Sequence, residues 1–168
     1  LGMGGIYIKD DVGGSAMTRF DAALIFEALA TGCPTVSAFI SIHNMASWMI
    51  DAYGSDAQRQ KWLPKLCTME LLASYCLTEP GSGSDVAATA TTALRGPGGW
   101  VLNGEKTYIS NGGIADVYVI IARTGEAAGA RGLSAFLLPA NTPGLRVVER
   151  IEVIAPHPLA HLALQDVV

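Results

Sequence analysis

The sequence predicts an α+β protein with a helical segment over residues 1–69 and a compact antiparallel, β-barrel-like domain over residues 70–168. In the first part, long apolar stretches are bounded by capping residues and glycine, as helices commonly are. In the second part, short apolar runs are separated by glycine-rich turns, which is typical of antiparallel strands. Hydrophobic residues make up 50% of the chain and charged residues 15%, a balance that suits a well-buried core.

Two successive helices are expected early in the helical segment. The run TRFDAALIFEALATG has Thr18 as a candidate N-cap, with Asp21 three residues later, and it ends at Gly32, a common C-terminal stop. Pro34 suits the first turn of the second helix, which continues to Tyr53. Because that helix is apolar on most faces, we expect it to be buried between other elements.

A third helix is expected where Ser55 and Gln58 form a capping box. Pro64 is expected to kink or end it, because proline cannot donate the backbone hydrogen bond of a helix interior. In the preceding helix, His43 and Asn44 interrupt the most membrane-like stretch of the chain. We interpret both as hydrogen-bonded core residues, and the stretch as a buried helix rather than a membrane span.

Strand signals dominate the rest of the chain. Asn103-Gly104 lies between apolar residues, and this dipeptide is the strongest short signal for a type I′ hairpin turn. A Gly/Ala-rich turn is expected over residues 125–132. Strands are expected in LLASYCLT, VAATATTALR (residues 86–95), GWVLNGEKTYIS, DVYVIIART, LSAFLLP, GLRVVERIEVI and HLALQDVV. Short connections predict an antiparallel sheet or barrel rather than a parallel βαβ sheet.

Charge and cysteine usage argue against several classes of function. The net charge of −4 is mild and does not suggest the basic face that nucleic-acid binding needs. Cys33, Cys67 and Cys76 are widely spaced and form no Cys-x-x-Cys pair, so neither a disulfide framework nor a zinc site is expected. A reducing compartment is the simplest interpretation.

The run EPGSGSD, residues 79–85, places glycines, serines and an acid directly after an apolar strand. A glycine-rich loop exposes backbone N–H groups and lets a ligand approach closely. This one is not a P-loop, because Gly83-Ser84 leads to Asp85 and not to Lys. It is not a Rossmann fingerprint either, because it leads toward a strand. These residues alone leave both a plain turn and a ligand-binding loop open.

The order of the motifs carries more information than any one of them. YCLTEPGSGSD, GWVLNGEKTYISNGG and ADVYVIIARTG follow one another as in the acyl-CoA dehydrogenase family, which this sequence resembles. The preceding runs DDVGGSAMTRFDAALIFEALATGCPTVSAFISIHNM and YGSDAQRQKWLPKLCTME, and the final LQDVV, extend the resemblance over nearly the whole chain. Branched-chain members look most similar, through IFEALATG, SIHNM and LCTME. The resemblance implies the end of the family's amino-terminal helical domain followed by its middle β domain.

The resemblance also implies that the loop lies against FAD and an acyl-CoA thioester. Ser84 matches a position that touches the CoA substrate as well, and Ser110 matches one whose hydroxyl approaches flavin N5. Tyr108 takes a place more often held by tryptophan or phenylalanine. The implied cofactor-binding residues are Tyr75, Cys76, Leu77, Thr78, Gly83, Ser84, Tyr108, Ile109 and Ser110. Each of these residues could instead have a purely structural role in a strand, a turn or the core, without contact to a cofactor.

By the same resemblance, the function is FAD-dependent α,β-dehydrogenation of a short or branched-chain acyl-CoA to the 2-enoyl-CoA. The resemblance implies that hydride passes to flavin N5 and that the electrons then pass to an electron-transfer flavoprotein. The general base is expected beyond Val168, in a carboxyl-terminal helical domain, so no catalytic residue is named. We therefore expect an internal fragment, inactive by itself, of a homotetramer in fatty acid or branched-chain amino acid catabolism. The compartment would be the cytoplasm of a bacterium or the mitochondrial matrix of a eukaryote.

Other functions remain open at this point. One is an acyl-CoA oxidase-like enzyme that gives its electrons to oxygen, and another is a non-catalytic interaction module of the same fold. The sequence also departs from the family pattern near its end, where RIEVIAPHPLAHLAL replaces a Lys-x-Gly turn. There, His157 and His161 are expected to be surface polar groups or to contact a partner domain.

Overall fold

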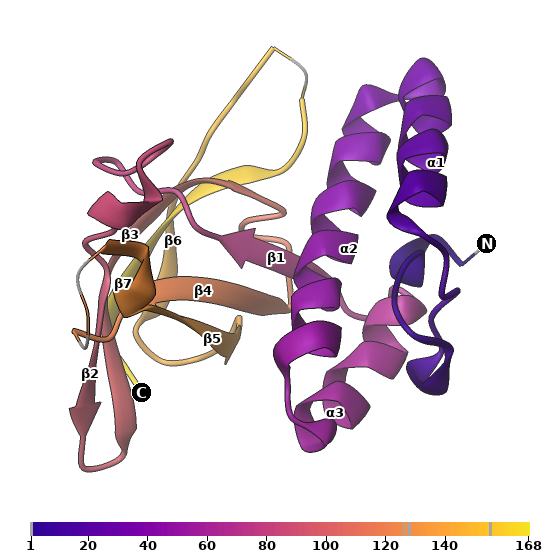
Figure 1. The fold of residues 1–168 in the computed structure, drawn as a ribbon. Helices are drawn as coiled ribbons and strands as arrows, with labels where there is room; N and C mark the ends of the chain where they lie inside the picture. The colour runs from indigo at the N-terminus through magenta and orange to yellow at the C-terminus, as the bar shows by residue number, and fades with distance from the viewer. Residues whose placement is uncertain (1, 126, 128, 155) are drawn as a thin grey trace.

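The computed structural model describes residues 2–125, 127, 129–154 and 156–168 of the chain. It places a helical layer beside a curled β-sheet (Figure 1). The short 3₁₀ turns Met3–Gly5 and Asp10–Val12 precede the long helices. These helices are α1 (Arg19–Gly32), α2 (Pro34–Tyr53) and α3 (Asp56–Cys67).

The predicted helix starts are confirmed. The Thr18 side chain accepts the backbone N–H of Asp21, whose carboxylate accepts the N–H of Thr18 in return. Ser55 and Gln58 make the same reciprocal pair at the start of α3. Pro34 occupies the first turn of α2, where its missing N–H removes no helical hydrogen bond. α1 and α3 therefore begin where a side chain satisfies a free N–H group, whereas α2 has no side-chain cap and begins at a proline.

The prediction for Pro64 was wrong about the end of the helix. Pro64 lies inside α3, which continues to Cys67. Leu63 and Leu66, on either side of the proline, are fully buried, so packing holds the last turn in place. Tertiary contacts thus outweigh the local cost of one missing helical hydrogen bond.

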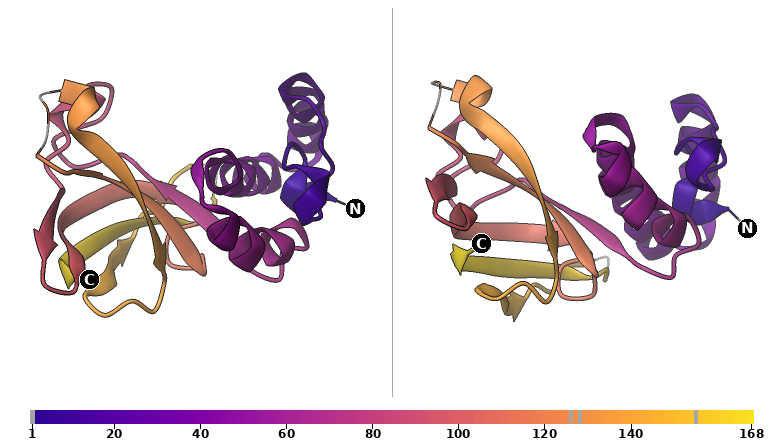
Figure 2. Two further views of the ribbon diagram at one scale, coloured as in Figure 1. Left: turned by 60° about the horizontal axis from the view of Figure 1, so that its bottom comes forward. Right: turned by 90° about the horizontal axis from the view of Figure 1, so that it is seen from below.

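The strands form one curled sheet to the side of the helices (Figure 2). Along the sheet the order is β1-β4-β2-β3-β7-β6, and β5 pairs with β4. The fold class is confirmed, since a helical region is followed by a half-barrel. The strands are β1 (Ala73–Cys76), β2 (Thr92–Gly96), β3 (Gly99–Ser110), β4 (Val117–Arg123), β5 (Leu133–Pro139), β6 (Leu145–Arg150) and β7 (Leu159–Val167).

The sheet is mixed rather than purely antiparallel. β1 runs parallel to β4, and β2 meets β4 in parallel at Thr92 and Arg123, whereas the β2–β3, β3–β7, β4–β5 and β6–β7 pairs are antiparallel. The chain leaves β1 through a loop, makes the β2–β3 hairpin, and only then returns beside β1. This long return allows β4 to run in the same direction as β1, which a tight turn could not do.

The predicted hairpin turn at Asn103-Gly104 was wrong. Both residues lie inside β3, and the turn of the β2–β3 hairpin is at residues 97–98, between the paired Gly96 and Gly99. Asn103-Gly104 instead marks a register shift between β3 and β7. There Gly104 has φ 152° and packs so closely on Thr91 that a Cβ would lie 2.4 Å from its Oγ1. The glycine serves a close approach of two backbones rather than a turn.

Two other segments also differ from the expected boundaries. The strand expected over residues 86–95 forms only at residues 92–95, because Val86–Ala88 makes a 3₁₀ turn capped by the Asp85 side chain. The turn expected over residues 125–132 ends in the 3₁₀ turn Gly129–Gly132, and its residues 126 and 128 lie outside the described residues.

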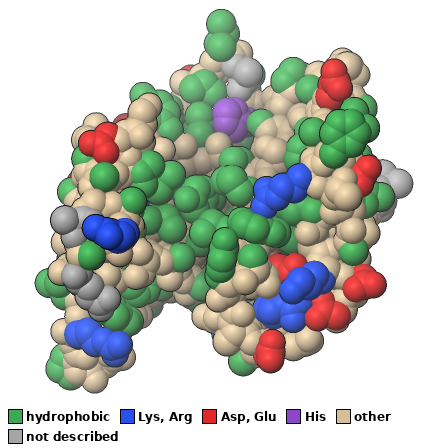
Figure 3. Space-filling view, viewed as in Figure 1, with side chains coloured by type: hydrophobic (Ala, Val, Ile, Leu, Met, Phe, Trp, Pro, Cys, Tyr) green, Lys and Arg blue, Asp and Glu red, His purple; other side chains and the backbone are tan. Residues whose placement is uncertain are grey.

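The core has separate parts inside the sheet and between the sheet and the helices. Leu102, Ile120 and Leu162 belong to the part inside the curl of the sheet. Leu63 and Val117 belong to the part between the helices and the sheet. Figure 3 shows further apolar side chains gathered in the hollow between the sheet and the helices. None of the helices in the described part of the chain has the length and apolarity needed to span a membrane.

Candidate functional site

The loop after β1 is closed by its own polar groups. Glu79 and Ser82 exchange backbone hydrogen bonds of 2.9 and 3.1 Å, which makes a tight turn. The Ser82 hydroxyl donates to the carbonyl oxygen of Asp85 at 2.8 Å. The Asp85 carboxylate in turn accepts the N–H of Ala87 at 3.1 Å. Several short-range hydrogen bonds within the loop therefore hold it closed.

The same loop also has unused hydrogen-bond donors. Among the described residues, the backbone N–H groups of Leu77, Thr78, Gly83 and Ser84 have no partner. Gly83 and Ser84 are exposed, and a Cβ added at Gly81 or Gly83 would meet nothing within 4 Å. No described part of the chain requires glycine at these two positions. The narrow loop with free donors is thus suited to a ligand with hydrogen-bond acceptors.

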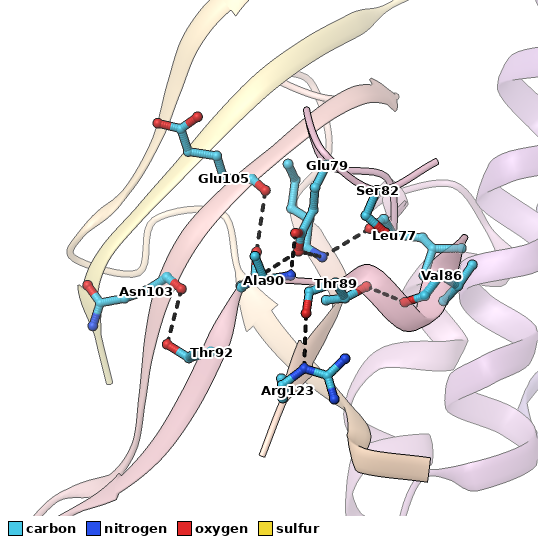
Figure 4. Close-up of polar contacts among 12 residues, drawn as sticks. Leu77, Glu79, Ser82, Val86, Thr89, Ala90, Thr92, Asn103, Glu105 and Arg123 are labelled. Carbon is cyan, nitrogen blue, oxygen red and sulfur yellow. Dashed lines mark hydrogen bonds and ion pairs between the residues drawn. The ribbon is translucent and has the colours of Figure 1, made fainter. Parts of the chain in front are cut away.

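A buried ion pair lies beneath the loop. Lys106 Nζ lies 2.7 Å from Glu79 Oε1 and also donates to the carbonyl oxygen of Leu77 at 3.0 Å. The Glu79 carboxylate accepts the N–H groups of Ala90 at 2.6 Å and Thr91 at 3.0 Å (Figure 4). The Lys106 side chain is 0% exposed and that of Glu79 is 5% exposed. This arrangement satisfies both charges inside the protein, as buried charges require.

These contacts exclude Glu79 as a general base. Burial raises the pKa of the Glu79 carboxyl, but hydrogen bonds from Lys106 and the two backbone N–H groups outweigh burial and lower it. Burial lowers the pKa of Lys106, and the Glu79 carboxylate opposes that shift. A carboxylate with a lowered pKa and both oxygens occupied is poorly placed to remove a substrate proton. Glu79 is a structural anion.

The second predicted motif contains a β-bulge. The β3–β7 pairing shifts register between Lys106 and Ile109, and Tyr108 within this shift has a left-handed φ of 53°. Tyr108 is 62% exposed, whereas the residues before and after it, Thr107 and Ile109, are buried. The N–H of Thr107 donates to the carbonyl oxygen of Thr78 at 2.9 Å. The bulge therefore presents Tyr108 outward next to the point where β3 holds the first loop.

Ser110 is also tied to the first motif. Its carbonyl oxygen accepts the hydroxyl of Ser74 at 2.7 Å, which joins the end of β3 to β1. Its own hydroxyl lies 3.4 Å from Nε2 of His157, which is half-buried. His161 lies elsewhere, with Nε2 3.3 Å from the Glu105 carboxylate. Of the two late histidines, only His157 contacts a predicted site residue.

The structure brings the two motifs together, but it buries some of their side chains and leaves others at the surface. Cys76 and Ile109 are buried in the sheet core, so only their backbone atoms could meet a ligand. Burial raises the pKa of the Cys76 thiol to about 12, which keeps it protonated. Tyr75 is half-buried and packs on the core between sheet and helices. Leu77, Thr78, Gly83, Ser84, Tyr108 and Ser110 keep exposed or partly exposed surface.

Sequence reasoning missed Asn111, which holds the two layers together. Its Nδ2 donates to the carbonyl oxygens of Phe39 in α2 at 3.1 Å and Ala73 in β1 at 3.2 Å. Its φ is 62°, a left-handed conformation that asparagine tolerates better than most residues. An asparagine before Gly112-Gly113 at the end of a strand was the available signal. It also missed Lys106, which its place in an alternating strand could have indicated.

Models of known protein families match both parts of the chain. The model described as acyl-CoA dehydrogenase, N-terminal domain, matches residues 1–70. The model described as acyl-CoA dehydrogenase, middle domain, matches residues 74–167. This chain belongs to the acyl-CoA dehydrogenase family. The resemblance predicted from the motifs is confirmed.

Individual relatives of this acyl-CoA dehydrogenase chain agree with the family. Mitochondrial isobutyryl-CoA dehydrogenase of Bos taurus is 54% identical over 145 residues, which are 86% of this chain and 35% of the relative. The solved FAD complex of PigA has a TM-score of 0.92 and 35% identity, over 99% of this chain and 45% of that chain. A chain from the solved electron transferring flavoprotein of Acidaminococcus fermentans has a TM-score of 0.93 and 30% identity, over 99% of this chain and 44% of that one. The chain thus spans less than half the length of each.

Proposed function

We propose that this chain provides the FAD-binding surface, and part of the acyl-CoA-binding surface, of an enzyme that oxidises a short or branched-chain acyl-CoA to the 2-enoyl-CoA. The observation that carries the proposal is the set of free backbone N–H groups in the loop over residues 77–84. The N–H groups of Leu77, Thr78, Gly83 and Ser84 are free, the glycines leave open space, and β3 holds the loop beside the outward-facing Tyr108. The similarity to the isobutyryl-CoA dehydrogenase relative supports the substrate class.

The free donors fit the acceptor groups of FAD. The N–H groups of Leu77 and Thr78 would bind oxygen and nitrogen acceptors on the edge of the flavin ring. Those of Gly83 and Ser84 would bind pyrophosphate oxygens, since backbone N–H groups in a glycine loop form anion sites. Ser84, which is exposed, would also contact CoA. The FAD-bound relative supports this assignment.

Residues of β3 would complete the cofactor surface. The exposed ring of Tyr108 would pack against the flavin, and the Ser110 hydroxyl would donate a hydrogen bond to N5. FAD, when bound, supplies the two-electron oxidation, which the side chains of this chain cannot perform. Cys76 and Ile109 would contribute backbone atoms only, because their side chains are buried.

The remaining parts of the enzyme are assigned by the family. The general base is proposed to come from outside residues 1–168, because the buried Glu79 is fully engaged. An electron-transfer flavoprotein is the proposed electron acceptor, and the similarity to the A. fermentans chain supports it. The assembly would be a homotetramer, located in the mitochondrial matrix of a eukaryote or the cytoplasm of a bacterium.

The test uses the full-length protein that contains this chain. FAD affinity is measured by fluorescence titration, and turnover is measured with isobutyryl-CoA and with straight-chain acyl-CoAs. Ser84→Trp is expected to lose FAD or acyl-CoA binding by bulk, whereas Gln60→Trp on the exposed face of α3 is expected to behave as wild type. Normal FAD content and turnover in Ser84→Trp would remove the loop from the site. Fast reoxidation by air would instead indicate an oxidase.

A further inference from the structure

We propose that the buried Glu79–Lys106 ion pair is a positioning device that holds the two cofactor motifs in one fixed arrangement. The inference rests on the proposed function and adds residues that act through the loop rather than by touching FAD. Glu79 and Lys106 are positioning residues, because neither side chain is exposed to a ligand.

Lys106 connects β3 to the loop that follows β1. Lys106 stands on β3 two residues before the outward-facing Tyr108. Its ammonium group binds the carbonyl oxygen of Leu77 and the carboxylate of Glu79, the residues on either side of Thr78. The Thr78 carbonyl oxygen accepts the next N–H of β3. The backbone at Thr78 is thereby held from three adjacent points, which leaves its N–H facing away from β3.

Glu79 closes the loop. Its carboxylate binds the N–H groups of Ala90 and Thr91, so the two ends of the segment over residues 79–91 meet at one side chain. Arg123 of β4 adds support from outside, since its guanidinium donates to the carbonyl oxygen of Thr89 (Figure 4) and also to that of Ala87. Gly83 and Ser84 lie within the closed segment. The position of their free N–H groups therefore depends on how Glu79 closes the segment.

The buried ion pair makes contacts here that apolar residues could not replace. Apolar residues of similar volume often replace buried ion pairs without loss of stability. Here, however, the pair also binds three backbone groups, those of Leu77, Ala90 and Thr91. Methionine or leucine would leave these groups unpaired, and the loop could adopt other arrangements. The pair is suited to specify one loop geometry, and the position of the site donors depends on that geometry.

The test compares paired variants in the full-length protein. Lys106→Met with Glu79→Gln removes both charges without leaving one of them buried alone. Asp51→Asn is the matched control, because Asp51 is a buried carboxylate in α2 that accepts Arg59 Nε and the N–H of Lys9, away from both motifs. The measurements are FAD affinity, the absorption spectrum and reduction potential of bound flavin, KM and kcat, and the thermal midpoint.

The double variant is expected to bind FAD roughly 10- to 100-fold more weakly, the scale on which supporting contacts act at ligand sites. Its residual bound flavin should show a shifted absorption spectrum and reduction potential. Asp51→Asn should lower the thermal midpoint but leave FAD affinity and potential unchanged. If the double variant does not fold, Glu79→Asp decides, because it keeps the charge but shortens the reach, and it should also shift the potential.

The outcomes separate the two proposals. Wild-type affinity, spectrum and potential in a folded double variant, or in Glu79→Asp, would overturn the positioning role while the proposed function stands. Equal effects of Asp51→Asn and the double variant on flavin would overturn it too, since both would then act through global stability. A wild-type protein that binds no FAD would overturn the proposed function itself.

Discussion

The backbone N–H of Ala73 in β1 donates to Nδ1 of His43 in α2, at 3.1 Å. The other ring nitrogen, Nε2, lies 2.9 Å from the carbonyl oxygen of Leu66 in α3. Because Nδ1 accepts a hydrogen bond, the proton of the neutral ring sits on Nε2 and is donated to Leu66. One buried imidazole thus joins two helices to the first strand of the sheet, and it does so only when it is neutral.

Stability should fall on acidification because of this histidine. Burial lowers the pKa of His43 in the folded protein, whereas the unfolded chain titrates near pH 6.5, at roughly the usual value. The contribution is therefore full above about pH 6.5 and is lost below it, by at most about 1.4 kcal/mol per pH unit, until the folded pKa is reached. Urea unfolding between pH 8 and pH 5 should show this slope. His43→Gln should flatten the slope; an equal slope in this variant and in the wild type would contradict the assignment.

Gly104→Ala should destabilise the sheet. The new Cβ would lie 2.4 Å from Thr91 Oγ1, and the φ of 152° is unfavourable for alanine. We expect a loss of about 1–3 kcal/mol, typical of overpacking a well-packed site, measured by thermal or urea unfolding. Gly32→Ala is the control, because a Cβ there meets nothing within 4 Å. A neutral Gly104→Ala would mean that β3 does not approach Thr91 this closely.

Gly83→Leu should separate binding from folding. A Cβ at Gly83 meets nothing within 4 Å, so the free energy of unfolding should change by about 0.5 kcal/mol or less. The same side chain should weaken FAD or acyl-CoA binding in the full-length protein, because it would occupy the open space beside the loop. Gly32→Leu, at another open glycine, is the matched control for binding. Unchanged binding in Gly83→Leu would place the ligand elsewhere.

Asn111 should show separable contributions from its backbone and its side chain. Asn111→Gly keeps the left-handed φ of 62° but loses the hydrogen bonds to Phe39 and Ala73, which should cost about 1–3 kcal/mol. Asn111→Ala loses the same bonds and adds about 1–2 kcal/mol of backbone strain. Chemical unfolding of both variants should therefore rank alanine as the less stable. The reverse order would show that this residue is not held in the left-handed region.

The helices could be predicted well because their signals are local. Thr18 with Asp21 and Ser55 with Gln58 satisfy free N–H groups within one turn, so nothing distant decides where these helices start. The loop at residues 79–85 was also recognisable, and the order of its motifs identified the family. Which of its donors stay free could not be predicted, because that depends on partners supplied by β3.

The sequence by itself determined the order of helices and strands, the capping of α1 and α3, and the family to which the chain belongs. Only the tertiary structure decided that Asn103-Gly104 lies inside a strand rather than in a hairpin turn, and that Lys106 is buried against Glu79. The physical reason is the distance along the sequence between the residues that interact. Capping depends on residues three positions apart, whereas a bulge or a buried ion pair is stable only when distant strands pack in one register and exclude water.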